Sequence, residues 1–429
     1  SENENWRILR EIKRRRSFVP VTVQENLDWQ KVSQIEVNAP DLPGVIIDVG
    51  DRREYPLGSE SAHLLGYVAS VSAKDIAGNR IGDPLLEIPN FRIGKSGIEK
   101  EQDLRLRGKA GNSQLEVNAV GRVIRELSRR EGQPGDDIVL TVDFGIQNLT
   151  TEKLRDKKSA AAVVMDVNTG SIIALASVPG YDPDSFDSGL TSQQWKEISS
   201  DPLAPLTNKA ISGLYAPGST FKMIVALAAL EKGVVTPDQN IFCRGHVEIG
   251  NARFHCWKKH GHGLVDLNTA LQQSCDSYFY EMAQRVGIDR IAEMARRFGL
   301  GDLTGIDLPN ERGGLMPTSF WKKKNLGVSW QKGETLNAGI GQGFILTTPL
   351  QLAVMTSRLA SGKAVKPHLI HGIFAGGVRK NFEIPPPKNI KISADLRRLV
   401  MKGMDAVSNT PRGTGYRARI KTPGFELAG

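Results

Sequence analysis

The feature that most constrains this chain is an apolar helix with two polar residues at its start. Residues 223–230 are apolar on every side, which predicts a fully buried helix, and Gly233 is a typical helix end. Ser219 and Lys222 stand at the start of this helix, three residues apart on one face. A Pro-Gly dipeptide at 217–218 precedes them and leaves room for a ligand to approach the backbone closely.

A Ser-x-x-Lys sequence in this position suggests an activated nucleophile. A serine hydroxyl reacts poorly until a base removes its proton, and a lysine can be that base when burial and nearby positive charges favour its neutral form. Amide dipoles at a helix start also favour negative charge that develops nearby. The alternative is a serine N-cap with a lysine that reaches water. Because Ser-x-x-Lys alone is common, a second motif is needed to decide.

Length and composition limit the remaining possibilities. A chain of 429 residues with 40% apolar residues has room for two or three domains with sizeable cores. The net charge of +9 permits an acidic partner or an anionic surface, but no interleaving of basic and aromatic residues indicates nucleic-acid binding. The longest apolar runs are too short for a membrane span, and no signal peptide is visible. The polar start at Ser1 is what a segment cut from a longer protein would show.

The composition divides the chain near residue 143. We expect residues 1–143 to form a strand-rich, non-catalytic domain and residues 144–429 to form the domain with the Ser-x-x-Lys helix. In the second domain an antiparallel hairpin at 160–177 leads into that helix, which predicts an α+β fold. The expected helices cover residues 7–16, 28–37, 143–154, 267–286, 288–298, 347–359 and 393–407. The expected strands cover residues 18–23, 45–49, 114–121, 137–142, 160–166 and 171–177.

The second motif is a Ser-x-Asp sequence at Ser274 and Asp276, within the helix expected over 267–286. A second hydroxyl and a carboxylate could shuttle a proton between Lys222 and a leaving amine. Ser-x-x-Lys, a Ser-Asp-Asn type of motif and Lys-Thr-Gly together are the motif set of penicillin-recognising enzymes. At these residues the chain resembles the class B penicillin-binding proteins, specifically the elongation-type penicillin-binding protein 2. Asp276 stands where many relatives carry Asn, as in other members of this subfamily.

The resemblance extends over nearly the whole chain. The stretches that carry it are His63 to Tyr67, Gly94 to Gly108, Ala216 to Lys222, Gly261 to Gly263, Ser274 to Asp276, and Gly341 to Gly343. It implies a penicillin-binding transpeptidase domain with an antiparallel sheet flanked by helices, after a pedestal domain. It also implies D,D-transpeptidation of peptidoglycan stem peptides, with Ser219 attacking the D-Ala-D-Ala carbonyl, and acylation of the same serine by β-lactams.

The resemblance further implies a place in the cell. The family is held in the bacterial inner membrane by one N-terminal helix, with the remaining domains in the periplasm. Expected partners are the membrane proteins of the elongation machinery, namely a SEDS-type glycosyltransferase and a periplasmic scaffold. No catalytic cofactor is expected.

Three other functions remain open. A D,D-carboxypeptidase would resolve the acyl-enzyme with water, and a serine β-lactamase would share the nucleophile. The large N-terminal domain disfavours both. A catalytically silent scaffold that docks membrane proteins through residues 1–143 belongs to a different class, and labelling by a fluorescent penicillin would distinguish it.

The cysteines and histidines gather in one region. All three cysteines and four of the seven histidines lie between Cys243 and Cys275. Because thiolate and imidazole are the ligands that zinc prefers, we expect a structural zinc site made of the set Cys243, Cys256, His262 and Cys275. The reserve ligands are His246, His255 and His260. A Cys243–Cys256 disulfide and a Cys275 that is simply a small buried residue are the alternatives.

The third motif of the family, Lys-Thr-Gly, is missing. The nearest sequence is Lys421-Thr422-Pro423-Gly424, in which the proline would disrupt a central strand. In the family the triad follows a sequence like residues 425–429, so we infer that this chain stops just before it. The strand that forms the oxyanion hole and the clamp for the substrate carboxylate would then be missing.

We therefore predict that residues 1–429 alone react slowly or not at all with a fluorescent penicillin. A missing oxyanion-hole donor typically lowers a rate by ~10²–10³. A chain extended past Gly429 should recover the reaction, as followed by a time course of gel labelling. Equal labelling rates for the two chains would contradict the inferred truncation.

Overall fold

The computed structural model describes most of the chain from residue 21 onward. The described residues are 21–429 without 25–26, 48–51, 79–81, 89–90, 119–122 and 381–383, together with Trp6, Ile8, Leu9 and Ile12. The helix predicted over 7–16 therefore lies mostly outside the described residues. Residues 18–20 of the first predicted strand lie outside them as well.

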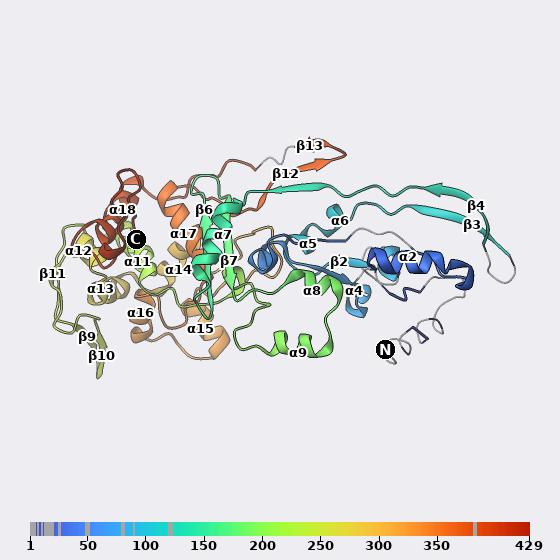
Figure 1. The fold of residues 1–429 in the computed structure, drawn as a ribbon. Coiled ribbons are helices and arrows are strands. Elements are labelled where there is room, and N and C mark those ends of the chain that lie inside the picture. The colour runs from blue at the N-terminus through green and yellow to red at the C-terminus, as the bar shows by residue number, and fades with distance from the viewer. Residues whose placement is uncertain are drawn as a thin grey trace. The chain divides into compact units, whose positions relative to one another are not determined.

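The chain forms two compact units (Figure 1). The first unit contains residues 1–138, 182–195 and 373–380, and the second unit contains residues 139–181, 196–372 and 381–429. Three of their five boundaries fall within elements, which are β5 (Asp137–Leu140), α9 (Ser192–Ser200) and β12 (Ile370–Ala375).

The first unit consists of short helices and antiparallel strand pairs. Strand β1 pairs with β2 and β3 pairs with β4, and β12 pairs with β13. The helix predicted over 28–37 is confirmed as α2, which Asp28 caps by accepting a hydrogen bond from the Lys31 N–H at 2.8 Å. The helices are α2 (Trp29–Val37), α3 (Ala62–Leu65), α4 (Ala73–Ala77), α5 (Gly97–Glu101), α6 (Asp103–Leu106) and α8 (Pro183–Ser188). The strands are β1 (Val68–Ser70), β2 (Arg92–Gly94), β3 (Asn112–Val117), β4 (Val123–Arg130) and β13 (Val378–Lys380).

The two strands predicted over 18–23 and 45–49 are wrong for those of their residues that the structure describes. Residues 21–23 and 45–47 form no strand, and most of their side chains are exposed. A run of β-branched residues becomes a strand only where a partner strand and a packed face support it. Neither run has such a partner in the described part of the chain.

The second unit is an α+β fold, as predicted, with helices packed around short antiparallel strand pairs. Strand β6 pairs with β7, which confirms the hairpin predicted at 160–177, while β8 pairs with β11 and β9 with β10. The strands are β6 (Ala160–Met165), β7 (Ile172–Val178), β8 (Ile241–Cys243), β9 (His246–Ile249), β10 (Ala252–His255) and β11 (Gly263–Val265). The helices are α7 (Phe144–Leu154), α10 (Lys209–Ser212), α11 (Lys222–Glu231), α12 (Leu267–Gln272), α13 (Asp276–Val286), α14 (Ile288–Arg297), α15 (Ser319–Leu326), α16 (Lys332–Gly339), α17 (Pro349–Ser361) and α18 (Ala394–Asn409).

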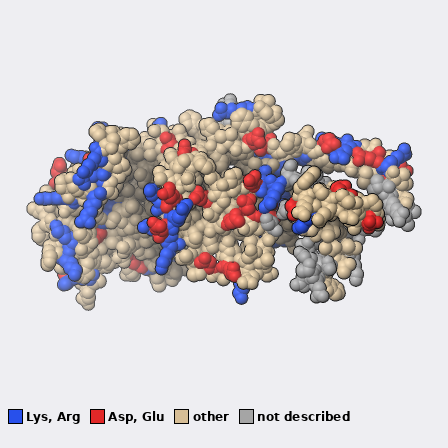
Figure 2. All heavy atoms as spheres, in the orientation of Figure 1, with Lys and Arg blue, Asp and Glu red and all other residues tan. Residues whose placement is uncertain are grey.

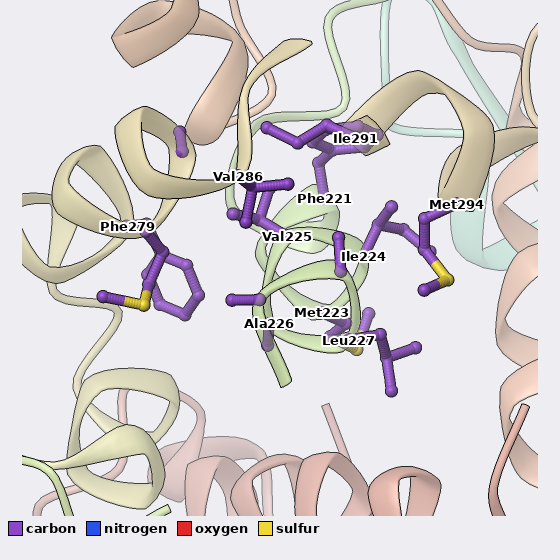
Figure 3. Close-up of a cluster of buried hydrophobic side chains, with 14 of the residues drawn as sticks. Phe221, Met223, Ile224, Val225, Ala226, Leu227, Phe279, Val286, Ile291 and Met294 are labelled. Carbon is purple, nitrogen blue, oxygen red and sulfur yellow. The ribbon is translucent and has the colours of Figure 1, made fainter. Parts of the chain in front are cut away.

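Helix α11 lies at the centre of the core of the second unit. All residues from 222 to 230 are buried, which confirms the helix predicted to be buried on every side. Figure 3 shows its side chains among Phe279 and Val286 of α13 and Ile291 and Met294 of α14. Because close-packed neighbours surround this helix, its first turn has a fixed position.

The single helix predicted over 267–286 is wrong, because the chain breaks it at Ser274. Helix α12 ends at Gln272 and α13 begins at Asp276. Ser274 between them has φ +51°, a left-handed backbone conformation that a helix cannot contain. Apolar residues recur at helical spacing on both sides of the break, so the sequence pattern does not reveal it.

Candidate active site

The turn before α11 presents Ser219 to solvent and buries Lys222. Residues Gly218–Phe221 form a short 3-10 helix that runs directly into α11. Residues three apart eclipse each other in such a turn, so Ser219 and Lys222 share one side. Ser219 is exposed, whereas the Lys222 side chain is only 2% exposed. The turn therefore joins an accessible hydroxyl to a buried amine.

Lys222 contacts the second motif through its ammonium group. Nζ donates to the Ser274 carbonyl oxygen at 3.0 Å, to Ser274 Oγ at 2.8 Å and to Asp276 Oδ1 at 2.6 Å. Ser274 Oγ donates to Ser219 Oγ at 2.9 Å. We call this arrangement of Ser219, Ser274, Lys222 and Asp276 the polar relay. It brings together the four residues that the sequence predicts to be catalytic.

The polar relay provides a route for a proton. Ser274 Oγ lies between the nucleophile candidate and Lys222, and hydroxyl hydrogens can rotate toward either neighbour. An ammonium group has three N–H donors, and here each of the three has an acceptor. With Lys222 as the ammonium, the arrangement can give a proton to a leaving group, and with Lys222 neutral it can accept the proton of Ser219 through Ser274.

The glycine segment at 341–343 lies against the turn that holds Ser219. The Gly218 N–H donates to the Gly341 carbonyl oxygen at 3.0 Å. A β-carbon at position 341 would lie 2.2 Å from the Gly218 carbonyl oxygen, and the φ of Gly341 is +71°. This segment therefore needs glycine so that its backbone can approach the backbone of the turn.

The four predicted zinc ligands lie together in the second unit. The ligand atoms of Cys243, Cys256, His262 and Cys275 are all within 4.8 Å of one another. Nδ1 of His262 lies 3.6 Å from the Sγ atoms of both Cys243 and Cys256. The three cysteines are buried free thiols. We call these four residues the Cys3His cluster.

Hydrogen bonding and burial affect the side chains of the Cys3His cluster. The hydrogen bond from the Cys275 thiol lowers the pKa of Cys256 to about 3, and that bond together with burial raises the pKa of Cys275. The bond thus favours thiolate, the form that binds metal, at Cys256 and disfavours it at Cys275. Nε2 of His262 is also buried and has no hydrogen-bond partner among the described residues.

The reserve histidines lie outside the Cys3His cluster. His246 and His255 are cross-strand partners in the β9–β10 pair, with their ring centroids 6.2 Å apart. Nε2 of His246 is 3.3 Å from Glu248 Oε1. His260 belongs to no candidate metal group among the described residues.

The segment nearest in sequence to Lys-Thr-Gly forms no part of the site. Residues 421–424 lie in an exposed turn, and Phe425 N–H donates to the Thr422 carbonyl oxygen at 3.2 Å. Pro423 thus stands in a turn, as expected for a residue that cannot join a central strand.

Sequence reasoning missed one residue of this region, Trp257. Its backbone N–H donates to Asp276 Oδ2 at 2.9 Å, and its indole N–H contacts two carbonyl oxygens of the second motif segment. The only signal in the sequence is its position directly after Cys256.

Positive charge gathers on the visible face of this part of the second unit. Figure 2 shows Lys and Arg side chains gathered over α18 and over the strands from β8 to β11. Arg244 and Arg253, on or beside these strands, have side chains that are more than half exposed, and both form ion pairs with Glu248. An anionic ligand would meet attractive charge here.

Two family models match the chain. The model described as "Penicillin binding protein transpeptidase domain" matches residues 160–429, and the model described as "Penicillin-binding Protein dimerisation domain" matches residues 1–140. The resemblance inferred from the motifs is thereby confirmed for both parts of the chain.

Curated relatives carry a consistent name. The protein called "Peptidoglycan D,D-transpeptidase MrdA" of Escherichia coli K12 is 38% identical over 412 residues, which are 95% of this chain and 65% of the relative. The protein of the same name from Haemophilus influenzae is 36% identical over 426 residues, with shares of 97% and 65%. The chain thus spans 65% of the length of these relatives.

Solved structures show the same fold. Penicillin-binding protein 2 of Pseudomonas aeruginosa, in complex with WCK 5153, has a TM-score of 0.73 and 34% identity, covering 87% of this chain and 79% of that one. Penicillin-binding protein 2 of Helicobacter pylori, in a complex with MreC, has a TM-score of 0.82 and 30% identity, with shares of 94% and 73%. Among the described residues, no helix has both the length and the apolar character needed to cross a membrane.

We predict that Gly341→Ala destabilises the turn that holds Ser219. The added β-carbon would clash with the Gly218 carbonyl oxygen. We expect this overpacking to lower the free energy of unfolding by about 1–3 kcal/mol, and the left-handed backbone of a non-glycine residue to lower it by about 1–2 kcal/mol more. Urea unfolding should show the lower free energy of unfolding, and hydrogen exchange should show faster exchange at the Gly218 amide.

Gly343→Ala is the matched control for this prediction. Gly343 also has a positive φ, of +76°, but a β-carbon there would be 3.5 Å from its nearest neighbour. The free energy of unfolding of this variant should fall only by the cost of left-handed strain, and its Gly218 amide should stay protected from exchange. Equal behaviour of the two variants would show that the close approach to Gly218 is unimportant.

Proposed function

Because the chain belongs to the penicillin-binding protein transpeptidase family, we propose that it is a peptidoglycan D,D-transpeptidase. The observation that carries the proposal is the polar relay, which links an exposed Ser219 through Ser274 to a buried Lys222. The name of the curated relatives, peptidoglycan D,D-transpeptidase, agrees with this chemistry. The reaction would cross-link stem peptides during cell elongation.

The first half of the reaction forms an acyl-enzyme at Ser219. Its Oγ bonds to the carbonyl carbon of the penultimate D-Ala, while its proton moves to Ser274 and the Ser274 proton moves to neutral Lys222. The tetrahedral intermediate then breaks the bond to the terminal D-Ala. The same relay returns a proton to that leaving amine.

The second half of the reaction transfers the peptide. The amine of a second stem peptide attacks the ester carbonyl, gives its proton to the relay, and forms the new amide bond as Ser219 Oγ leaves and is reprotonated. A β-lactam would follow only the first half, because its opened ring stays attached and blocks the acceptor. Resolution by water instead of an amine would make the protein a D,D-carboxypeptidase, and nothing in the polar relay favours that outcome.

The proposal extends to location and partners. Structures of relatives include a complex of penicillin-binding protein 2 with MreC and a peptidoglycan synthase complex. By analogy, this protein would act in the periplasm, anchored in the inner membrane by an N-terminal helix. It would work with a periplasmic scaffold and a SEDS-type glycosyltransferase. The competing proposal of a silent scaffold would need no relay at Ser219.

We predict that the full-length protein gains the mass of one β-lactam, detected by intact mass spectrometry, and that Ser219→Ala gains none. Lys222→Ala should form the adduct at least ~10²-fold more slowly, because the proton acceptor is lost. Lys232→Ala is a matched control, since that lysine lies at the other end of α11 and bonds carbonyl oxygens of Arg285 and Val286. An adduct that persists on Ser219→Ala would overturn the assignment.

We also propose that the Cys3His cluster holds a structural zinc ion. Ligand atoms on a tetrahedral zinc are about 3.5–3.8 Å apart, which agrees with the 3.6 Å separations from His262 Nδ1 to the two sulfur atoms. The donor set of three thiols and one imidazole is one that zinc prefers. Such an ion would tie residues 243–262 to the start of α13, where Cys275 precedes Asp276.

We predict about one zinc per chain by plasma mass spectrometry after dialysis against a weak chelator. Cys275→Ala should lose the metal, whereas His260→Ala, which changes a histidine outside the Cys3His cluster, should keep it. Thiol titration should find the three cysteines protected until the metal is removed. A folded, metal-free protein with a mapped Cys243–Cys256 disulfide would rule the site out.

A further inference from the structure

Trp257 makes three hydrogen bonds to the second motif segment. Its backbone N–H donates to Asp276 Oδ2 at 2.9 Å. Its indole N–H is shared between the carbonyl oxygens of Gln273 at 3.0 Å and Ser274 at 3.1 Å. One residue from outside α12 and α13 thus contacts both sides of the break between them.

The acceptors of these bonds need an outside donor. Carbonyl groups at the end of a helix have no partner within the helix, and Gln273 is the residue that follows α12. Ser274 has a left-handed backbone, a conformation that costs about 1–3 kcal/mol and persists only where the surroundings enforce it. Lys222 Nζ and the Trp257 indole both donate to the Ser274 carbonyl oxygen. These two bonds fix the direction of that carbonyl.

The Asp276 carboxylate is oriented in the same way. One of its oxygens accepts from Lys222 Nζ at 2.6 Å and the other accepts from the Trp257 backbone. A carboxylate held at both oxygens cannot rotate away from Lys222 without breaking a bond. Trp257 is well placed for this role, because it directly follows Cys256 and its ring lies 5.4 Å from that of His262.

We propose that Trp257 is a positioning residue for the second motif. It would hold Ser274 and Asp276 where they can contact Lys222, and so would set the rate at which Ser219 is acylated. The kinetic part of this inference rests on the proposed transpeptidase function, whereas the positioning itself does not. Trp257 is not a catalytic residue, since it acts through the two residues that it bonds.

The test is Trp257→Phe in the full-length protein, which removes the indole N–H donor and keeps an aromatic ring. We expect the first-order rate of penicillin acylation to fall about five- to tenfold, the worth of one hydrogen bond, with the noncovalent affinity unchanged. The amides of Ser274 and Cys275, which bond Leu271 and Ala270 carbonyls, should exchange faster by a similar factor. A purely structural role would instead lower the fraction of protein that reacts and leave the rate of the remainder unchanged.

Trp195→Phe is the matched control, because Trp195 lies on α9 and is 48% exposed, compared with 59% for Trp257. Trp195→Phe should change neither the acylation rate nor the exchange of the Ser274 and Cys275 amides. Zinc content measured on each variant separates loss of the indole bonds from loss of a metal. If Trp257→Phe folds poorly, the isosteric 3-benzothienylalanine at position 257 removes the N–H and keeps the ring shape.

The outcomes separate the two proposals. A full-length protein that forms no penicillin adduct refutes the transpeptidase proposal, and amide exchange alone then decides the positioning role. Unchanged acylation and unchanged exchange in the Phe or benzothienylalanine variant overturn the positioning role. Slower acylation with faster exchange at Ser274 and Cys275, at constant zinc content, supports it.

Discussion

The buried ion pair between Lys222 and Asp276 is the interaction on which the rest of the site depends. The two side chains are 2% and 13% exposed, and a buried ammonium is costly unless it is paired and fully hydrogen-bonded. All three acceptors of Lys222 come from Ser274 and Asp276. The ammonium can therefore be buried only when the second motif is in place, which makes the folding of the two motifs mutually dependent.

The core explains why this pair has a fixed geometry. Helix α11 is buried on every side, so its first turn cannot shift without disturbing α13 and α14, which pack against it. The same helix α13 begins with Asp276. The two partners of the ion pair thus stand at the starts of two helices that pack on each other. The apolar core fixes the distance between them, while Ser219, on the short turn before α11, is the member of the polar relay that is exposed to solvent.

The sequence predicted those parts of the site that depend on residue type and spacing. Ser219 and Lys222 could be found because two polar residues at the start of an apolar helix are unusual. The four members of the Cys3His cluster could be found because all of them carry side chains that bind zinc. The break at Ser274 could not be predicted. Ser274 occupies the left-handed position of a local helix ending, which usually carries glycine or asparagine, and tertiary hydrogen bonds hold its carbonyl oxygen, while the helical pattern of apolar residues continues on both sides. The role of Trp257 was missed for a similar reason, since its donors act on groups of another segment.

The break at Ser274 connects the polar relay to the Cys3His cluster through the backbone. Cys275 lies between Ser274 and Asp276, and Cys256 directly precedes Trp257. Cys275 therefore lies within the second motif, and Cys256 is the neighbour of Trp257, which bonds that motif. A metal that fixed the two sulfur atoms would also fix the Trp257 N–H groups against the carbonyls and carboxylate that they bond. Left-handed strain at Ser274 persists because Lys222 and the Trp257 indole both hold its carbonyl oxygen, and a bound metal would restrain Trp257 further.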